Sequence, residues 1–490
     1  MPFYRLLTFA AAILSAPVLF AESPQDAPRP IPPTRPEMKR LIEDVKVRVP
    51  RIPLPALTDA ERESSGDASS SYESRLRQHY LSGMEEPRGG RGPGGAGGTR
   101  GPSGTGQPGG PGGTGRREQD PDMSLDNAFK VELFWIVSRT NNCQYCLGHQ
   151  ESKLLAAGLT EDRIAALDSH WMEFPEKEQV AFAFARKFTY EPHRLTDADI
   201  AALKTHFSDK QILEMILSMA GNNTINRWKE GVGVPQRKDE GGYSRLARQA
   251  EENGTPLTEP RRPSGTYLTA TSPEYEKRVT QVAPLKFDPK TGEPTRETVS
   301  VRPPLESDAE VAKMLTAARS RAPRLPLVEE DQARKAIGEN WNADAPLPNW
   351  VRLLATFPRT GGSQVRRIQT AEQKGDLSPL LKAQLAWILA RQDRAWYALG
   401  EAQRRLKGLG QTDEQIQALD GEWQEFTPRE QSLFVVAKKL GASPVVLTDS
   451  DVARAVEAAG PRDTVQTVSY TTNRASFNRI TEAAGLPLEP

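Results

Sequence analysis

An internal repeat constrains this sequence more than any other feature. Sliding the 490-residue chain by 252 positions brings matching residues together over about a hundred positions without a gap. The matched pairs are Leu147-Gly148 with Leu399-Gly400, Ala166-Leu167-Asp168 with Ala418-Leu419-Asp420, Trp171 with Trp423, Glu173-Phe174 with Glu425-Phe426, Thr196-Asp197 with Thr448-Asp449, Asn226-Arg227 with Asn478-Arg479, and Pro235 with Pro487. A constant offset of this length predicts two related structural units.

The match continues upstream at a different spacing. The segment Pro50 to Leu54 resembles Pro323 to Leu327, now 273 positions apart, so the first copy carries extra residues before Glu132. We place them in the run from Gly89 to Gly115, which consists mainly of Gly, Pro, Ser and Thr. Such a run cannot bury much apolar surface, and we expect a flexible, disordered insert there.

Composition limits the class of protein. Hydrophobic residues make up 37% of the chain, below the roughly 45–50% of compact globular proteins, which indicates that part of it is not packed. Lysine plus arginine equals aspartate plus glutamate at 64 each, so no overall charge attracts nucleic acid. We therefore expect no nucleic-acid partner.

The first 21 residues are typical of an export signal. Arg5 supplies a positive charge, an apolar run extends from Leu6 to Phe20, and Ala21 is a suitable cleavage residue. The run is short for a membrane span, although an uncleaved N-terminal anchor is the alternative. We expect a periplasmic or secreted protein with no membrane span after signal cleavage.

Helix signals dominate both copies, and no alternating strand pattern of useful length is present. Ser124 to Arg139 has helical spacing, Gly158 is expected to end the next helix, and Pro175 to start another. Thr196 and Ser208 begin capping-box patterns. The sequence therefore predicts an all-α fold of two tandem helical lobes. Its expected parts are a signal peptide (1–21), a Pro-rich and helical lead-in (22–86), a Gly-rich insert (87–120), a first lobe (121–238), a linker (239–302) and a second lobe (303–490).

The two cysteines of the chain point to chemistry in the first lobe. Cys143, Cys146 and His149 are spaced at three residues, which places neighbours on one face of a helix that an Asn before Cys143 can cap. A thiol near a helix N-terminus ionises more easily, and an imidazole can relay its proton. Glu132, 11 residues before Cys143, is a second candidate relay, whether the helix runs on or breaks at the Asn pair.

Two structural alternatives remain open for the cysteine pair. A disulfide between Cys143 and Cys146 would suit an oxidising compartment, but so small a loop constrains the unfolded chain little. A structural zinc site would need four ligands, and only His149 is near the pair in sequence. We expect neither a metal nor a cofactor. Trp171, Phe174 and their partners in the second copy are expected in the core.

The second lobe lacks every candidate catalytic group. At the 252-residue offset, Cys143 meets Ala395, Cys146 meets Ala398, His149 meets Glu401 and Glu132 meets Gln384. Asn226 and Arg227 recur in both lobes, which favours a role in the fold. We expect the second lobe to pack on the first as one subunit of a homo-oligomer packs on another.

The stretch from Glu132 to Pro235 resembles the alkylhydroperoxidase D-like, carboxymuconolactone decarboxylase superfamily. The resemblance rests on Glu132, the run Asn142 to His149, Leu167-Asp168 with Trp171, Asn226-Arg227-Trp228 and Val234-Pro235. The second lobe resembles the same family without the motif. The resemblance implies helical oligomers, Cys146 as attacking thiolate, Cys143 as resolving thiol, His149 and Glu132 as proton relay, and no cofactor. The best-known members carry the His one position later, where this chain has Gln150.

Three functions remain open from the sequence. The first is an exported peroxidase that reduces a hydroperoxide substrate and is restored by an external dithiol reductant. The second is a non-catalytic envelope binding or scaffold protein with a locked disulfide. The third is a decarboxylase-like enzyme, against which the retained thiols argue, because that branch of the family works without them.

Overall fold

A computed structural model describes residues 29, 32, 35–56, 72–84, 120–236, 305–342 and 344–489. All regular elements in these residues are helices, which confirms the all-α prediction. The expected signal peptide, the linker and all of the Gly-rich insert except Asp120 lie outside the described residues. Across the ranges that are described, no helix combines the length and the apolar character that a membrane crossing requires.

Eight α-helices belong to the described part of the first lobe and its lead-in. They are α1 (Arg35–Asp44), α3 (Tyr72–Tyr80), α4 (Asn127–Thr140), α5 (Gln144–Ala156), α6 (Glu161–Ser169), α7 (Glu176–Tyr190), α8 (Asp197–Lys204) and α9 (Asp209–Val232). Both predicted capping boxes are present, at Thr196 with Asp199 and at Ser208 with Gln211. Gly158 follows the end of α5 with a φ of 88°, a left-handed conformation that suits glycine.

Two helix starts differ slightly from the sequence prediction. The helix expected from Ser124 begins instead at Asn127, because the Asp126 carboxylate caps it by accepting a 3.0 Å hydrogen bond from the Phe129 N–H. Pro175 occupies the capping position before α7 and not its first turn. Both differences amount to a few residues at a helix end, where local capping bonds decide.

Nine α-helices form the described part of the second lobe. They are α12 (Asp308–Ser320), α13 (Glu330–Ile337), α14 (Asn349–Leu354), α15 (Pro358–Gln373), α16 (Pro379–Asp393), α17 (Trp396–Gly408), α18 (Asp413–Gln417), α19 (Pro428–Gly441) and α20 (Asp449–Ala483). Helices α5 and α17 start and end 252 positions apart. Helix α20 is kinked at Gly460, before Pro461, at the position that matches the break between α8 and α9.

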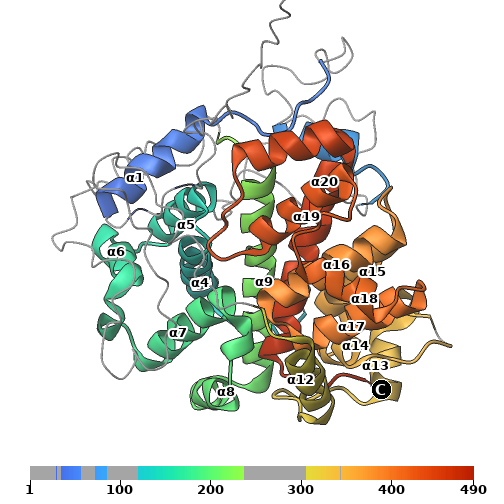
Figure 1. The fold of residues 1–490 in the computed structure, drawn as a ribbon. Coiled ribbons are helices and arrows are strands. Elements are labelled where there is room, and N and C mark those ends of the chain that lie inside the picture. The colour runs from blue at the N-terminus through green and yellow to red at the C-terminus, as the bar shows by residue number, and fades with distance from the viewer. Residues whose placement is uncertain are drawn as a thin grey trace, which may run out of the picture.

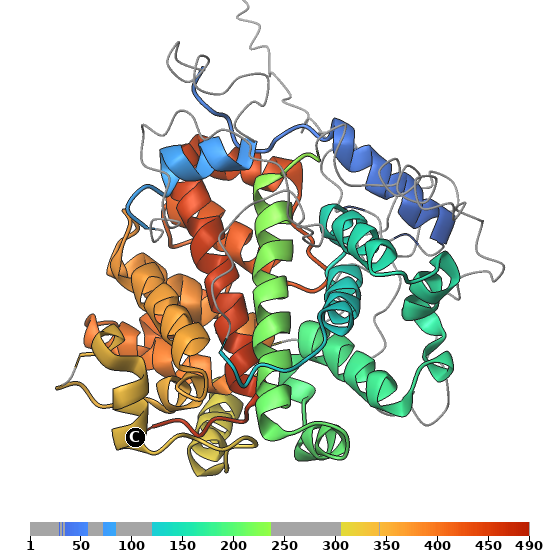
Figure 2. The same cartoon turned by 180° about the vertical axis from the view of Figure 1, so that it is seen from behind.

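Helices α9 and α20 pack against each other at the centre of the molecule (Figures 1 and 2). Helices α4 to α8 lie on one side of this pair and α12 to α19 on the other. A Cβ added to Gly231 of α9 would lie 2.6 Å from the Val468 side chain of α20, so only glycine permits this approach. The lobes therefore meet through a tight helix pair.

Two arginines, Arg51 and Arg324, tie the lobes together in the same way. Each donates hydrogen bonds to a backbone carbonyl of its own lobe and to one of the other lobe. The bonds run from Arg51 to Glu230 (2.6 Å) and Leu447 (3.0 Å), and from Arg324 to Glu482 (2.6 Å) and Leu195 (2.8 Å). The acceptors Glu230 and Glu482 lie 252 positions apart, and so do Leu195 and Leu447, so the two contacts are reciprocal.

The residues expected to serve the fold are buried in it. Trp171 is 1% exposed and its indole donates a 2.8 Å bond to the carbonyl of Leu167, one turn earlier. Trp423 makes the matching 2.7 Å bond to Leu419. Arg227 is fully buried and donates a 2.6 Å bond across the lobe boundary to the hydroxyl of Ser443.

Candidate functional site

A break between α4 and α5 places the two cysteines. Helix α4 ends at Thr140, and Asn142 turns the chain with a left-handed φ of 59°. Cys143 itself is the capping residue of α5, and its N–H donates a 2.9 Å bond to the carbonyl of Ser138. The expected cap by an Asn is therefore wrong, because the Asn142 side chain instead accepts a 2.6 Å bond from the amide of Gln144.

The two sulfur atoms lie side by side, as the spacing predicts. The Sγ atoms of Cys143 and Cys146 are 2.7 Å apart, and both residues are buried, at 0% and 2% exposure. Burial raises the pKa of Cys143 well above its ordinary value, and the hydrogen bond with Cys146 adds to the rise. The easy ionisation expected at a helix start is thus absent at Cys143, because burial outweighs the helix dipole.

A carboxylate lies on the Cys143 side of the pair. Glu230, near the end of α9, is 2% exposed and forms an ion pair with Arg48 at 3.1 Å. After burial and the bonding to Cys146, the charge of Glu230 raises the pKa of Cys143 further. This environment keeps Cys143 in its thiol form.

Two lysines interact with Cys146, whereas the cation that interacts with Cys143 is Arg48, the ion-pair partner of Glu230. Burial lowers the pKa of Lys153, and the charge of a Cys146 thiolate opposes that effect. The ammonium of Lys229 lies 4.3 Å from the ring centroid of Tyr145. Burial acts to lower the pKa of Lys229, but Glu73, and to a smaller extent a Cys146 thiolate, raise it overall. The two sulfurs therefore have unequal surroundings.

His149 lies on α5, one turn beyond Cys146, and is partly exposed. Its ring centroid is 4.8 Å from that of Tyr145. The neighbouring Gln150 is buried, and its side-chain amide donates a 3.3 Å bond to the carbonyl of Cys146. His149 therefore supplies the imidazole in this turn of the helix.

Glu132 lies in a second environment. Its side chain is buried in α4, and a carboxylate oxygen lies 3.6 Å from the guanidinium of Arg163. Burial raises the pKa of Glu132 to about 7, and the charge of Glu178 adds to this effect. Glu132, Arg163, Glu178 and His206 line a cavity of about 630 Å³ that contains neither cysteine. The described contacts of Glu132 are therefore separate from the sulfurs.

The second lobe places different chemistry at the equivalent positions. Ala395 caps α17 as Cys143 caps α5, and both Ala395 and Ala398 are fully buried. Burial raises the pKa of Glu401, at the position of His149, to about 7, while Arg474 opposes the rise. Helix geometry is retained there without a thiol.

Sequence reasoning found the sulfurs but missed the charged residues around them. Lys229 and Glu230 directly follow the Asn226-Arg227-Trp228 run and could have been found by extending that helix by one turn. Arg48 and Lys153 carry no sequence signal of their own. Within the described ranges, no three His, Cys, Asp or Glu side chains form a group that could hold a metal ion.

Comparisons with known proteins do not identify the chain. It matches no model of a protein family, and no curated protein matches its sequence.

Proposed function

We propose that the protein is a dithiol oxidoreductase that reduces hydroperoxides at Cys143 and Cys146. The observation that carries the proposal is the 2.7 Å approach of the two sulfurs at the start of α5, in a chain with two cysteines. Two thiols at this separation can form a disulfide after one of them is oxidised.

The unequal surroundings favour Cys146 as the nucleophile. Lys153 and Lys229 interact electrostatically with Cys146, whereas burial and Glu230 raise the pKa of Cys143. The Cys146 thiolate attacks the terminal oxygen of the hydroperoxide, the O–O bond breaks, and the alkoxide leaves as an alcohol after taking a proton. Cys146 is then a sulfenic acid.

Cys143 completes the reaction. Its sulfur attacks the sulfur of the Cys146 sulfenic acid, a disulfide forms, and water leaves with the Cys143 proton. An external dithiol then reduces the disulfide by thiol exchange and is itself oxidised. We assign proton transfer at the sulfurs to His149, and Glu132 is the second relay candidate, with its cavity next to Arg163.

The same proposal places the protein in the alkylhydroperoxidase D-like, carboxymuconolactone decarboxylase superfamily, in a periplasmic or secreted location. The all-α fold supports it. The packing of α9 on α20 supports a second lobe that acts as a structural partner, in the way one subunit of a homo-oligomer supports another.

A second candidate function is a non-catalytic binding or scaffold protein on the same fold. The burial of both cysteines and the raised pKa of Cys143 favour it, because an inert structural thiol pair is typically buried.

Stopped-flow oxidation of the reduced full-length protein separates the two candidates. We expect hydrogen peroxide or an organic hydroperoxide to oxidise the wild type, and Cys146→Ser to slow the reaction by about 100-fold or more. Cys143→Ser retains the first step and accumulates sulfenic acid. Ala398→Ser, at the matching position of the second lobe, is the control and leaves the rate unchanged. A wild type that reacts no faster than a free small thiol would establish the scaffold function.

A further inference from the structure

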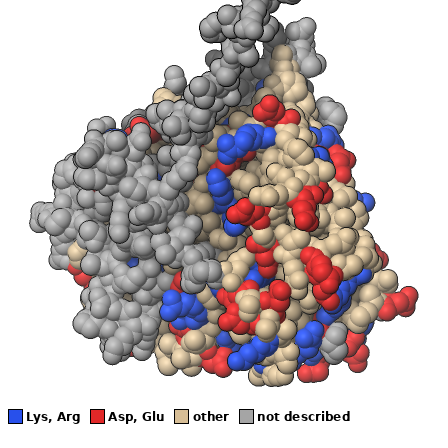
Figure 3. Space-filling model, viewed as in Figure 1, with Lys and Arg blue, Asp and Glu red and all other residues tan. Residues whose placement is uncertain are grey.

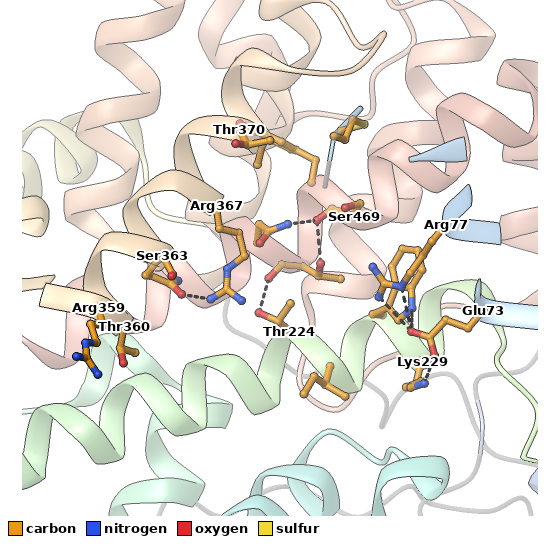
Figure 4. Close-up of a pocket in the computed structure, with 18 residues that line it drawn as sticks. Glu73, Arg77, Thr224, Lys229, Arg359, Thr360, Ser363, Arg367, Thr370 and Ser469 are labelled. Atoms are coloured by element: carbon orange, nitrogen blue, oxygen red, sulfur yellow. Dashed lines mark hydrogen bonds and ion pairs between the residues drawn. The ribbon is translucent and has the colours of Figure 1, made fainter. Parts of the chain in front are cut away.

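A groove lies between the lobes, and neither cysteine lines it, although Lys229 lines the groove and also interacts with Cys146. It has a volume of about 720 Å³, and helices α3, α9, α15 and α20 form its walls (Figure 4). This volume is within the range of small-molecule sites, roughly 300–1,000 Å³.

The charged side chains that line the groove are mainly positive. They comprise one carboxylate and four cations, namely Glu73, Arg77, Lys229, Arg359 and Arg367. A concave surface with an excess of one sign concentrates ligands of the opposite sign. The groove therefore favours an anion.

One end of the groove is already neutralised. Glu73 pairs there with Lys229 and with Arg77, the latter at 3.1 Å, and accepts a 2.7 Å bond from the indole of Trp228. Burial would raise the pKa of Glu73, but these cations, Lys229 first, lower it to about 2. Glu73 is thus ionised, and its charge is paired with Lys229 and Arg77.

Arg367, in the middle of α15, has no such neutralisation. Its side chain is reachable by solvent, and its hydrogen bond in the described structure goes to the neutral amide of Gln364. Among the described residues, no carboxylate forms an ion pair with it.

Apolar surface lies on the opposite wall. Ile225 of α9 is 43% exposed, one of the most exposed large hydrophobic residues described. Trp228, one turn later, is 3% exposed, and the guanidinium of Arg77 lies 4.1 Å from the centroid of its ring. The hydroxyl of Thr224 donates a 3.3 Å bond to the carbonyl of Thr472. Figure 4 shows Arg367 and Thr224 facing each other across the groove.

We propose that this groove binds an organic anion, a carboxylate or phosphate monoester attached to an apolar group. The anionic group pairs with the guanidinium of Arg367, and the apolar group lies on Ile225. The proposal uses neither sulfur, and it places the ligand on Arg367 and Ile225, not on Lys229, the groove residue that also interacts with Cys146.

Calorimetric titration of the full-length protein with hexanoate, hexyl phosphate, 1-hexanol and inorganic phosphate tests the site. We expect one of the two hexyl anions to bind, and to bind about tenfold more tightly than 1-hexanol or inorganic phosphate. Preference for hexanoate assigns a carboxylate ligand, and preference for hexyl phosphate a phosphate monoester.

Two arginine variants make the test specific. Arg367→Gln weakens binding of the preferred anion about tenfold. Arg366 is an exposed neighbour outside the groove, and Arg366→Gln changes the affinity for the same anion less than about twofold. Ile225→Ser weakens the hexyl anion but not inorganic phosphate. Absence of binding by both hexyl anions, or equal losses in the two arginine variants, would overturn the proposal.

Discussion

The two lobes share a framework and differ at the site. In the first lobe, Arg139 pairs with Asp168 at 3.1 Å, and in the second the matching Arg391 pairs with Asp420 at 2.8 Å. At the starts of α5 and α17, two thiols in the first lobe are replaced by two alanines in the second, whereas Tyr145 and Tyr397 occupy the same position. The framework ion pair is therefore present in both lobes, while the thiols are present in one.

The charged neighbours of the thiols follow the same division. Lys229 of the first lobe corresponds to Thr481, which bonds to carbonyls of its own helix. Glu230 corresponds to Glu482, which pairs with Arg321 at 3.0 Å. The carboxylate is retained with a structural partner in each lobe. Of the two lysines on the Cys146 side, Lys153 corresponds to another cation, Arg405, and Lys229 alone is specific to the first lobe.

The face drawn in Figure 3 mixes positive and negative side chains over the second lobe. This agrees with the equal totals of 64 basic and 64 acidic residues and with the absence of an overall charge. The excess of cations in the groove is thus a local feature.

The largest expected difference between the lobes concerns their buried interface arginines. Arg479 forms an ion pair with Asp393 at 3.1 Å, and both are fully buried, whereas the described hydrogen bonds of Arg227 to side chains go to Asn223 and Ser443. We expect Arg479→Gln to lower the free energy of unfolding by about 3–5 kcal/mol, because it leaves a buried carboxylate unpaired. Arg227→Gln should cost about 1–3 kcal/mol. Urea denaturation measures both, and equal losses would contradict the asymmetry.

The next effect concerns Glu132, whose partner position in the second lobe carries Gln384. The folded pKa of Glu132, about 7, exceeds the ordinary value of 4.5, so its protonated form stabilises the fold below pH 4.5 and this stabilisation is lost as pH rises through 7. We expect Glu132→Gln to gain about 1–3 kcal/mol relative to wild type between pH 5 and pH 8.

Denaturation of both proteins at the two pH values measures this gain. The difference between variant and wild type cancels the titration of other carboxylates. An unchanged difference would show that the Glu132 carboxyl titrates normally.

The smallest expected difference is between Arg51→Ala and Arg324→Ala. Each change removes a pair of hydrogen bonds to backbone carbonyls, at a cost of about 1–2 kcal/mol. Because the contacts are reciprocal, the two costs should agree within about 0.5 kcal/mol, as measured by thermal and urea unfolding. A larger difference between the two losses of stability would show that the two arginine contacts do not contribute equally to the packing of the lobes.

Local patterns predicted much of the fold. The capping boxes at Thr196 and Ser208 and the helix end at Gly158 follow from short-range hydrogen bonding, which the sequence displays directly. The closeness of Cys143 and Cys146 follows from helix periodicity in the same way.

Long-range packing accounts for what the sequence did not reveal. The burial of Cys143 and its neighbour Glu230 depends on how α9 crosses the start of α5, a contact between segments far apart in the chain. The cavity around Glu132 depends equally on α6 and α7, which supply Arg163 and Glu178. No spacing within one helix encodes these arrangements.

The joining of α9 and α20 in one polypeptide has a consequence for concentration. Separate subunits held by such a contact would dissociate on dilution, whereas covalently connected partners meet at an effective concentration in the millimolar range whatever the amount of protein present. The thiol-bearing lobe therefore keeps its partner lobe even at low protein concentration. A substitution in one lobe is also not repeated in the other.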